Sequence, residues 1–177
     1  MSRLNLVHAS VVDMEADAVV NAANNVLLMG SGVCGAIFSK AGSAQLAEAC
    51  RAYDVPLEDG SAVITPAFGI KNAKYIIHAV GPDFRRTPDA IDALFSAYYN
   101  SLTVLMENGL HSIAFPLISG GIFGGSRDNP TADSVRQCCM AYKKFTSDHP
   151  DYDVEVTLCA FAYAEMLDAK FVFSQMV

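Results

Sequence analysis

Two glycine-rich segments, each preceded by a short apolar run, constrain the fold of this chain more than any other feature. The first follows residues 18–20 and spans 21–35 (NAANNVLLMGSGVCG), and the second follows 113–118 and spans 119–125 (SGGIFGG). Glycine lets backbone N–H groups approach a ligand closely, and successive N–H groups can form a concave anion site. Each segment alone is also consistent with an ordinary strand-to-helix turn. Together with the asparagines of the first, the two segments favour a nucleotide-diphosphate site enclosed from both sides.

Length and charge limit the kinds of protein that this chain can be. Its 177 residues, 52% of them hydrophobic, predict one compact domain covering residues 1–177. The formal net charge of −7 argues against nucleic acid as a partner, because binding a phosphate backbone requires several lysines or arginines together. If the protein binds phosphate, backbone amides and helix N-termini must therefore hold it.

The cysteines and the apolar segments bear on the cellular environment. The five cysteines are odd in number and include the adjacent pair Cys138 and Cys139, a pattern typical of reduced thiols. The most apolar late segment, 154–173, is interrupted by charged residues, and the N-terminus lacks the pattern of a secretory signal. We therefore expect a cytoplasmic protein with no membrane association.

Apolar periodicity alternates between short strand-like runs and longer helical ones. Strands are predicted over 4–12, 18–20, 62–65, 75–80, 112–117 and 154–161, and helices over 33–40, 43–53, 87–108, 129–147 and 164–173. Thr87-Pro88 and Asn129-Pro130 are predicted helix starts, and Asn108-Gly109 is a predicted stop. This order predicts an α/β fold, a three-layer α/β/α sandwich with a central mixed, largely parallel sheet. In such sheets ligands bind beyond the carboxyl ends of the strands, where both glycine-rich segments would lie.

Five motifs in a fixed order make the chain resemble a known family. They are NAAN (21–24), GVCGAI (32–37), KYIIHAVGP (74–82), SIAFP (112–116) and SGGIFG (119–124). Over nearly its whole length the chain resembles the macro domain, an α/β/α module that binds ADP-ribose. The resemblance is closest to the hydrolytic bacterial and viral branch, whose members remove ADP-ribose from acidic side chains.

The resemblance implies a role for each matching residue. Asn24 would hydrogen-bond the distal ribose, because its amide offers both donors and an acceptor. Residues 30–33 would close over the distal ribose and diphosphate, residues 119–123 would face them, and Phe123 would lie against the distal ribose. The implied ADP-ribose-binding set is Ser10, Val11, Ala22, Asn24, Gly30, Ser31, Gly32, Val33, Leu117, Ser119, Gly120, Gly121, Ile122, Phe123 and Phe161.

Two aromatic side chains are each open to a structural and a functional interpretation. Phe161, at the end of the last predicted strand, is either an adenine-stacking residue or a plain core aromatic. His78 lies in the middle of a predicted central strand, and the resemblance gives it no role as an essential base. We interpret His78 as a buried structural histidine with satisfied hydrogen bonds. His111 and the cysteine pair do not have metal-ligand spacing, so no metal is expected.

Two positions depart from the family pattern. Ser10 stands where the family usually carries an aspartate that accepts the adenine amino group, and a hydroxyl makes a weaker bond than a carboxylate. Asp13 is close enough in sequence to replace it. Cys34 stands where many hydrolytic members carry an aspartate, and a neutral thiol is a poor general base. Cys34 could instead be a nucleophile if the start of the following helix lowered its pKa. Asn24 and Cys34 are thus the catalytic candidates.

Two main hypotheses for the function follow from the resemblance. The favoured one is a metal-independent mono-ADP-ribosyl hydrolase, which would act on proteins modified on acidic side chains and would also deacetylate O-acetyl-ADP-ribose. The other is a non-catalytic reader of ADP-ribose or of ADP-ribosylated proteins. A third, binding of poly(A) or other RNA, is disfavoured by the negative charge. Either main hypothesis makes ADP-ribose the ligand or product, with ADP-ribosylated proteins as partners and no cofactor.

Overall fold

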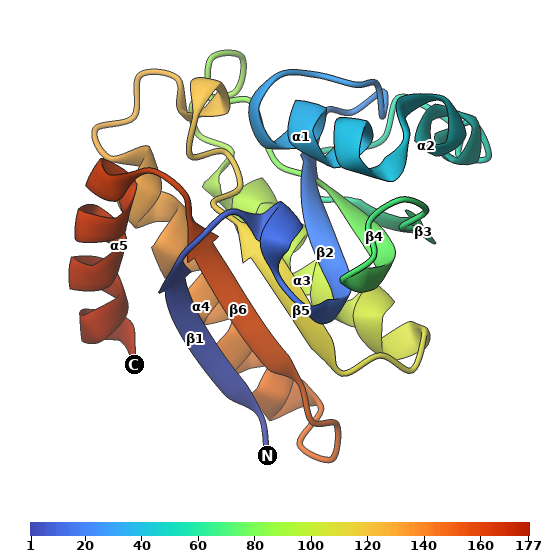
Figure 1. Cartoon of the computed structure of the whole chain (residues 1–177). Helices are drawn as coiled ribbons and strands as arrows, with labels where there is room; N and C mark the ends of the chain where they lie inside the picture. The colour runs from blue at the N-terminus through green and yellow to red at the C-terminus, as the bar shows by residue number, and fades with distance from the viewer.

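A six-stranded mixed sheet forms the centre of the computed structural model, which describes residues 1–177 (Figure 1). The strand order is β1-β6-β5-β2-β4-β3, and all neighbours are parallel except β3, which runs antiparallel to β4. The strands are β1 (Arg3–His8), β2 (Ala16–Ala23), β3 (Ala62–Pro66), β4 (Ala73–Val80), β5 (Ser112–Pro116) and β6 (Glu155–Ala160).

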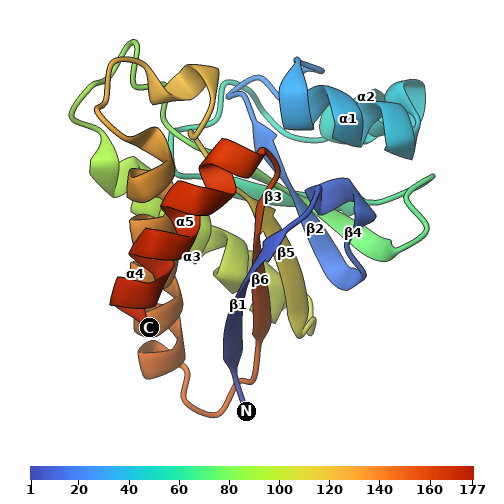
Figure 2. The same cartoon turned by 60° about the vertical axis from the view of Figure 1, so that its left-hand side comes forward.

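Helices cover both faces of this sheet (Figures 1 and 2). They are α1 (Gly32–Ala41), α2 (Ser43–Cys50), α3 (Ile91–Glu107), α4 (Pro130–Asp148) and α5 (Tyr163–Met176), with two single 3₁₀ turns, η1 (Val11–Asp13) and η2 (Ile122–Gly124). The helices α3, α4 and α5 pack on one face, and α1, α2 and η1 on the other. None of the five α-helices combines the length and the apolar content that a membrane-spanning helix requires. The predicted three-layer α/β/α sandwich is confirmed.

The apolar core is divided by the sheet into two layers, and strand alternation assigns residues to each. In β2, Ala18 and Val20 pack toward α3, α4 and α5, whereas Val19 packs toward α1 and α2. All three side chains are completely buried. When both faces of a sheet are covered, the side chains on both sides of a central strand are buried, so its sequence is a continuous apolar run. β2 is therefore fixed in the middle of the molecule.

Two of the predicted boundaries are corrected. The predicted strand over 4–12 ends at His8, and residues 11–13 form η1 instead. The predicted helix start at Thr87-Pro88 is wrong, because α3 begins at Ile91. Thr87 Oγ1 donates to the Asp83 carbonyl at 3.2 Å within a preceding turn and so does not cap the helix. The start at Asn129-Pro130 is confirmed, since Asn129 Oδ1 accepts the Ala132 N–H at 3.0 Å.

The parallel strands place five loops at one edge of the sheet. β2 leads to α1 on one face, whereas its neighbour β5 leads to α4 on the opposite face. Two adjacent strands whose connections diverge in this way form a topological switch point, where α/β folds bind ligands. The loops that leave these two strands are the two glycine-rich segments, so the fold places them side by side.

Candidate functional site

The first loop, residues 24–31, is shaped by the side chain of Asn24. Its Nδ2 donates to the Leu28 carbonyl at 2.7 Å, and its Oδ1 accepts the N–H groups of Val26 at 3.3 Å and Leu28 at 3.0 Å. An amide has two N–H donors, so one of them stays free for a ligand. Asn24 thus fixes its own loop and presents one donor beside it.

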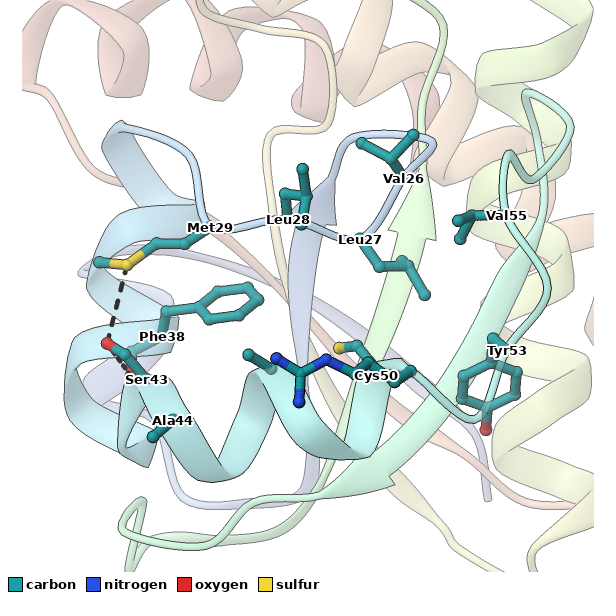
Figure 3. A pocket seen from close by; sticks show the side chains of 12 residues that line it. Val26, Leu27, Leu28, Met29, Phe38, Ser43, Ala44, Cys50, Tyr53 and Val55 are labelled. Atoms are coloured by element: carbon teal, nitrogen blue, oxygen red, sulfur yellow. Dashed lines mark hydrogen bonds between the residues drawn. The ribbon is translucent and has the colours of Figure 1, made fainter.

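The other side of this loop closes an apolar cavity of about 720 Å³ against α2 (Figure 3). Leu27 and Phe38 are buried between the loop and the helix. Ser43 Oγ donates to the Met29 sulfur at 3.7 Å, and the Leu57 N–H donates to the Asn25 carbonyl at 2.8 Å. These contacts hold the Asn24 loop at both ends.

Glycine at position 35 allows the first loop to lie directly on α1. A Cβ on Gly35 would lie 2.7 Å from the Gly30 carbonyl oxygen, a distance that real Cβ atoms do not tolerate. Gly32, the first residue of α1, has φ of +59°, which favours glycine, and a Cβ there would meet nothing within 4 Å. One glycine is therefore required by close packing and the other by backbone conformation.

The second loop, residues 117–125, is held from beneath by two helices. Tyr98 of α3 accepts the Ile118 N–H at 3.0 Å and lies 2.6 Å from Ser134 Oγ of α4, which donates to the Ile118 carbonyl at 2.6 Å. Ser119 has φ of +56°, and its hydroxyl donates to the Pro82 carbonyl at 2.7 Å. Both polar groups of Ile118 are thereby satisfied, which fixes the loop as it leaves β5.

Sequence reasoning missed this support for the loop. Within the predicted helix over 87–108, Tyr98 falls in an apolar stripe with Leu94 and Leu102, and this pattern assigns no role to its hydroxyl. Tyr98 and Ser134 are completely buried, and a buried hydroxyl needs a hydrogen-bond partner. A tyrosine inside an otherwise apolar stripe was the available signal.

A polar cavity of about 350 Å³ lies between Asn24 and Phe123. The Phe84 N–H donates to the Phe123 carbonyl at 2.8 Å, and the Arg85 guanidinium lies 5.5 Å from the centre of the Phe123 ring. The remaining lining residues are Asn25, Asp59, Gly81, Asp83, Arg86 and Thr87. The cavity is thus lined by both candidate ribose contacts and by charges of both signs.

Two carboxylates in this cavity have different surroundings. Arg85 donates to Asp83 through two nitrogens, at 2.9 and 2.7 Å, and these bonds lower the pKa of Asp83. The pKa of Asp59 is raised, first by partial burial and then by the negative charge of Asp83. Asp83 is therefore held as an ion pair, while Asp59 has the weaker acidity of the two.

A third cavity, of about 390 Å³, brings together Ser10 and Phe161, the two residues predicted around adenine, with five others of the predicted ADP-ribose-binding set. Its predicted members are Ser10, Val11, Gly32, Val33, Leu117, Gly121 and Phe161. Phe161 is 69% exposed, so the interpretation as a core aromatic is wrong. Asp13 does not line this cavity, and its carboxylate lies 3.4 Å from Lys40 Nζ. The structure therefore gives no support to Asp13 as a replacement for the missing aspartate.

The remaining six predicted binding residues line neither the cavity of Asn24 and Phe123 nor the cavity of Ser10 and Phe161; Ala22 lies in β2 and the other five lie in the two loops. They are Ala22, Gly30, Ser31, Ser119, Gly120 and Ile122. Ser31 precedes α1 without a side-chain capping bond, and Ile122 is 67% exposed. The arrangement leaves backbone amides, rather than these side chains, as the groups that can face an anion between the loops.

His78 is a structural histidine, as predicted. It is completely buried, and its ring nitrogens lie 3.0 Å from Asn21 Nδ2 and 2.9 Å from Thr65 Oγ1. Burial lowers the pKa of His78 to about 4, so the ring is neutral near pH 7. Its hydrogen bonds span β2, β4 and β3 rather than reaching a cavity.

Cys34 does not have the environment of a nucleophile. The side chain is buried, and its thiol donates to the Leu28 carbonyl at 3.5 Å. Burial raises the pKa of Cys34, although the Gly30 backbone and Asn21 oppose the shift. The shift of this pKa is therefore upward, opposite to the lowering that the nucleophile hypothesis requires. As a catalytic candidate, Cys34 therefore lacks an available thiolate.

The fold and the site geometry agree with the comparison to known proteins. Residues 20–132 match the sequence model of the macro domain family, and the chain belongs to this family.

The chain is similar to individual relatives in sequence and to a solved structure in fold. The chain is 37% identical over 161 residues to the ADP-ribose glycohydrolase MACROD1 of Mus musculus, covering 90% of this chain but only about half, 48%, of that protein. It is 44% identical over 130 residues to the O-acetyl-ADP-ribose deacetylase of Citrobacter rodentium, covering 71% of this chain and 72% of that protein. A Trypanosoma brucei macrodomain solved in complex with ADP-ribose superposes with a TM-score of 0.82 at 30% identity, covering 95% of this chain and 68% of that chain.

Proposed function

We propose that the protein binds ADP-ribose across the carboxyl edge of its sheet. The observation that carries this proposal is the position of the two glycine-rich loops at the switch point between β2 and β5. Adenine would lie in the cavity of Ser10 and Phe161, and the distal ribose in the cavity of Asn24 and Phe123. The diphosphate would span the two cavities and accept hydrogen bonds from backbone amides of residues 30–33, 119 and 121–123, since the Gly120 N–H donates to the Leu117 carbonyl at 3.1 Å.

We further propose that the protein hydrolyses ADP-ribose from modified acidic side chains of proteins. In this reaction water forms a bond to the anomeric carbon of the distal ribose, and the bond to the side-chain carboxylate breaks. The names of the mouse and Citrobacter relatives support hydrolysis of ADP-ribose derivatives. Catalysis would come from positioning and electrostatics: Asn24 would orient the ribose, and the loop amides would hold the diphosphate. Deacetylation of O-acetyl-ADP-ribose would use the same cavities.

A non-catalytic reader is the second candidate function, and one observation favours it. Cys34 is a buried, protonated thiol at the position where the family resemblance places a carboxylate. A missing general base lowers a rate by about 10²–10⁴-fold. A protein that bound ADP-ribose and released none from a modified substrate would be such a reader.

Calorimetry with ADP-ribose, followed by incubation with a protein mono-ADP-ribosylated on glutamate, separates the two functions. Binding with loss of the modification supports the hydrolase, and binding without loss supports the reader. Failure to bind ADP-ribose would contradict both. Repeating the titration between about 50 and 200 mM salt tests the role of backbone amides, because binding through several lysines or arginines would weaken steeply with salt.

A further inference from the structure

We propose that Asp59 is the general base of this site, accepting the proton of the water that attacks the distal ribose. This inference rests on the proposed hydrolase function. Its starting point is that Asp59 lines the same cavity as Asn24 and Phe123, the two candidate ribose contacts. No family motif in the sequence pointed to this residue.

The antiparallel direction of β3 explains why Asp59 reaches the site. Because β3 runs opposite to β4, the residues that precede β3 lie at the edge where β4 ends. The Gly60 N–H donates to the Val80 carbonyl at 2.6 Å, and the Val80 N–H donates to the Ser61 carbonyl at 2.8 Å. Asp59 is therefore brought to the edge that carries the ligand-binding loops.

The turn that carries Asp59 is anchored on both sides. On one side, Leu57 is hydrogen-bonded to Asn25, the residue after the candidate ribose contact. On the other, Gly60 is buried with φ of +93°, and its carbonyl accepts Asn100 Nδ2 of α3 at 2.8 Å. A general base must keep a fixed position relative to the substrate. These bonds tie the position of Asp59 to that of Asn24.

The other titratable groups near the ribose are not available as bases. Asp83 is held by two hydrogen bonds from Arg85. Cys34 keeps its proton, and His78 lies buried among strand residues. Asp59 is exposed and forms no ion pair or side-chain hydrogen bond. It is the one carboxylate of the cavity whose oxygens remain free to accept a proton.

The proposed step is balanced without any further reactant. The water oxygen bonds to the anomeric carbon of the ribose, and one water proton passes to the Asp59 carboxylate. The bond between that carbon and the ester oxygen breaks, and its electron pair leaves with the glutamate or aspartate as a carboxylate. The leaving group needs no proton because a carboxylate is a stable anion. The products are ADP-ribose and an unmodified acidic side chain, and Asp59 returns its proton to solvent.

The charges around Asp59 suit this role. Asp83, Arg85 and Arg86 face the cavity from the loop after β4, and Glu58 precedes Asp59 on its own turn. Partial burial and the negative charge of Asp83 raise the pKa of Asp59, which makes it a stronger base than an ordinary aspartate. Asn24, Asn25 and Phe123 complete the lining without charge.

The test compares Asp59→Asn with Glu58→Gln in single-turnover hydrolysis of a protein mono-ADP-ribosylated on glutamate. Both changes remove one exposed negative charge from the same turn, but Glu58 does not line the cavity. We expect D59N to slow hydrolysis by about 10²–10⁴-fold with unchanged affinity for free ADP-ribose. We expect E58Q to keep the wild-type rate. The wild-type rate should rise with pH through the pKa of Asp59, and D59N should lose this rise.

The outcomes distinguish failure of this inference from failure of the proposed function. Wild-type activity together with an equally active D59N would overturn the role of Asp59 alone. A slow D59N that keeps the wild-type pH profile would also overturn it, because a merely structural role does not remove the titration. Absence of turnover in the wild type would overturn both proposals.

Discussion

Acidification should destabilise this protein through His78, and the size of the effect follows from its burial. The folded state holds the pKa of His78 at about 4, against an ordinary value of 6.5. Above pH 6.5 neither state binds the proton, so His78 costs no stability there. As the pH falls below 6.5, the unfolded chain takes up a proton that the folded protein refuses, and stability is lost until the pH passes the folded pKa. The full difference between the folded and unfolded pKa of His78 corresponds to about 3 kcal/mol in the free energy of unfolding, of which about 2 kcal/mol is lost by about pH 5.

Urea unfolding at about pH 7.5 and pH 5 measures this loss in the wild type and in His78→Gln. The variant should be less stable at the higher pH, because Asn21 and Thr65 lose their partner. Its further loss on acidification should be about 2 kcal/mol smaller than that of the wild type, since the carboxylates contribute equally to both. If the wild type and H78Q lost the same free energy of unfolding on acidification, the low pKa of His78 would not be the cause of the loss.

Four further variants test the candidate ligand site. Phe161→Ala should weaken ADP-ribose binding by about tenfold or more in calorimetry, because base stacking contributes about 1–3 kcal/mol. Unchanged affinity would contradict the placement of adenine in the cavity of Ser10 and Phe161. Gly121→Glu should abolish binding of ADP-ribose and leave the melting temperature unchanged, since a Cβ at position 121 meets nothing within 4 Å. Gly32→Glu should abolish binding as well, and it should also lower the free energy of unfolding by about 1 kcal/mol because residue 32 has a positive φ. Tight binding by G121E would contradict the position of the diphosphate. Tyr98→Phe should cost about 1–3 kcal/mol in urea unfolding, because the buried Ile118 N–H loses its acceptor, and a neutral result would mean that water replaces the hydroxyl.

The parts of the fold that sequence predicted are those encoded by neighbouring residues. Asn129 and Pro130 specify a helix start by themselves, one through its side-chain acceptor and the other through its fixed φ. The apolar run of β2 and the glycines that follow it specify a buried strand and a close turn. Such signals also placed the two glycine-rich loops at one edge, because parallel strands end together.

The parts that sequence did not predict depend on residues far apart in the chain. Thr87 has the chemistry of a helix cap, but the carbonyl of Asp83 engages its hydroxyl. Whether Phe161 was exposed depended on the end of β6, and the pKa of Cys34 depended on how deeply α1 packs. Local patterns carry no information about such burial.

The candidate site combines two loops that are stabilised in different ways, and this difference bears on where chemistry can occur. The loop after β5 is held by buried hydroxyls of α3 and α4, so its amides are fixed before any ligand arrives. The loop after β2 is held mainly by its own Asn24 and by the turn that carries Asp59. Preorganised donors favour binding of the unreactive diphosphate, whereas the reacting end needs a group that can gain and lose a proton. Under the two proposals, binding and proton transfer therefore fall to different elements. The backbone amides of the two loops would bind the diphosphate, and Asp59, on the turn before β3, would supply the carboxylate that position 34 lacks.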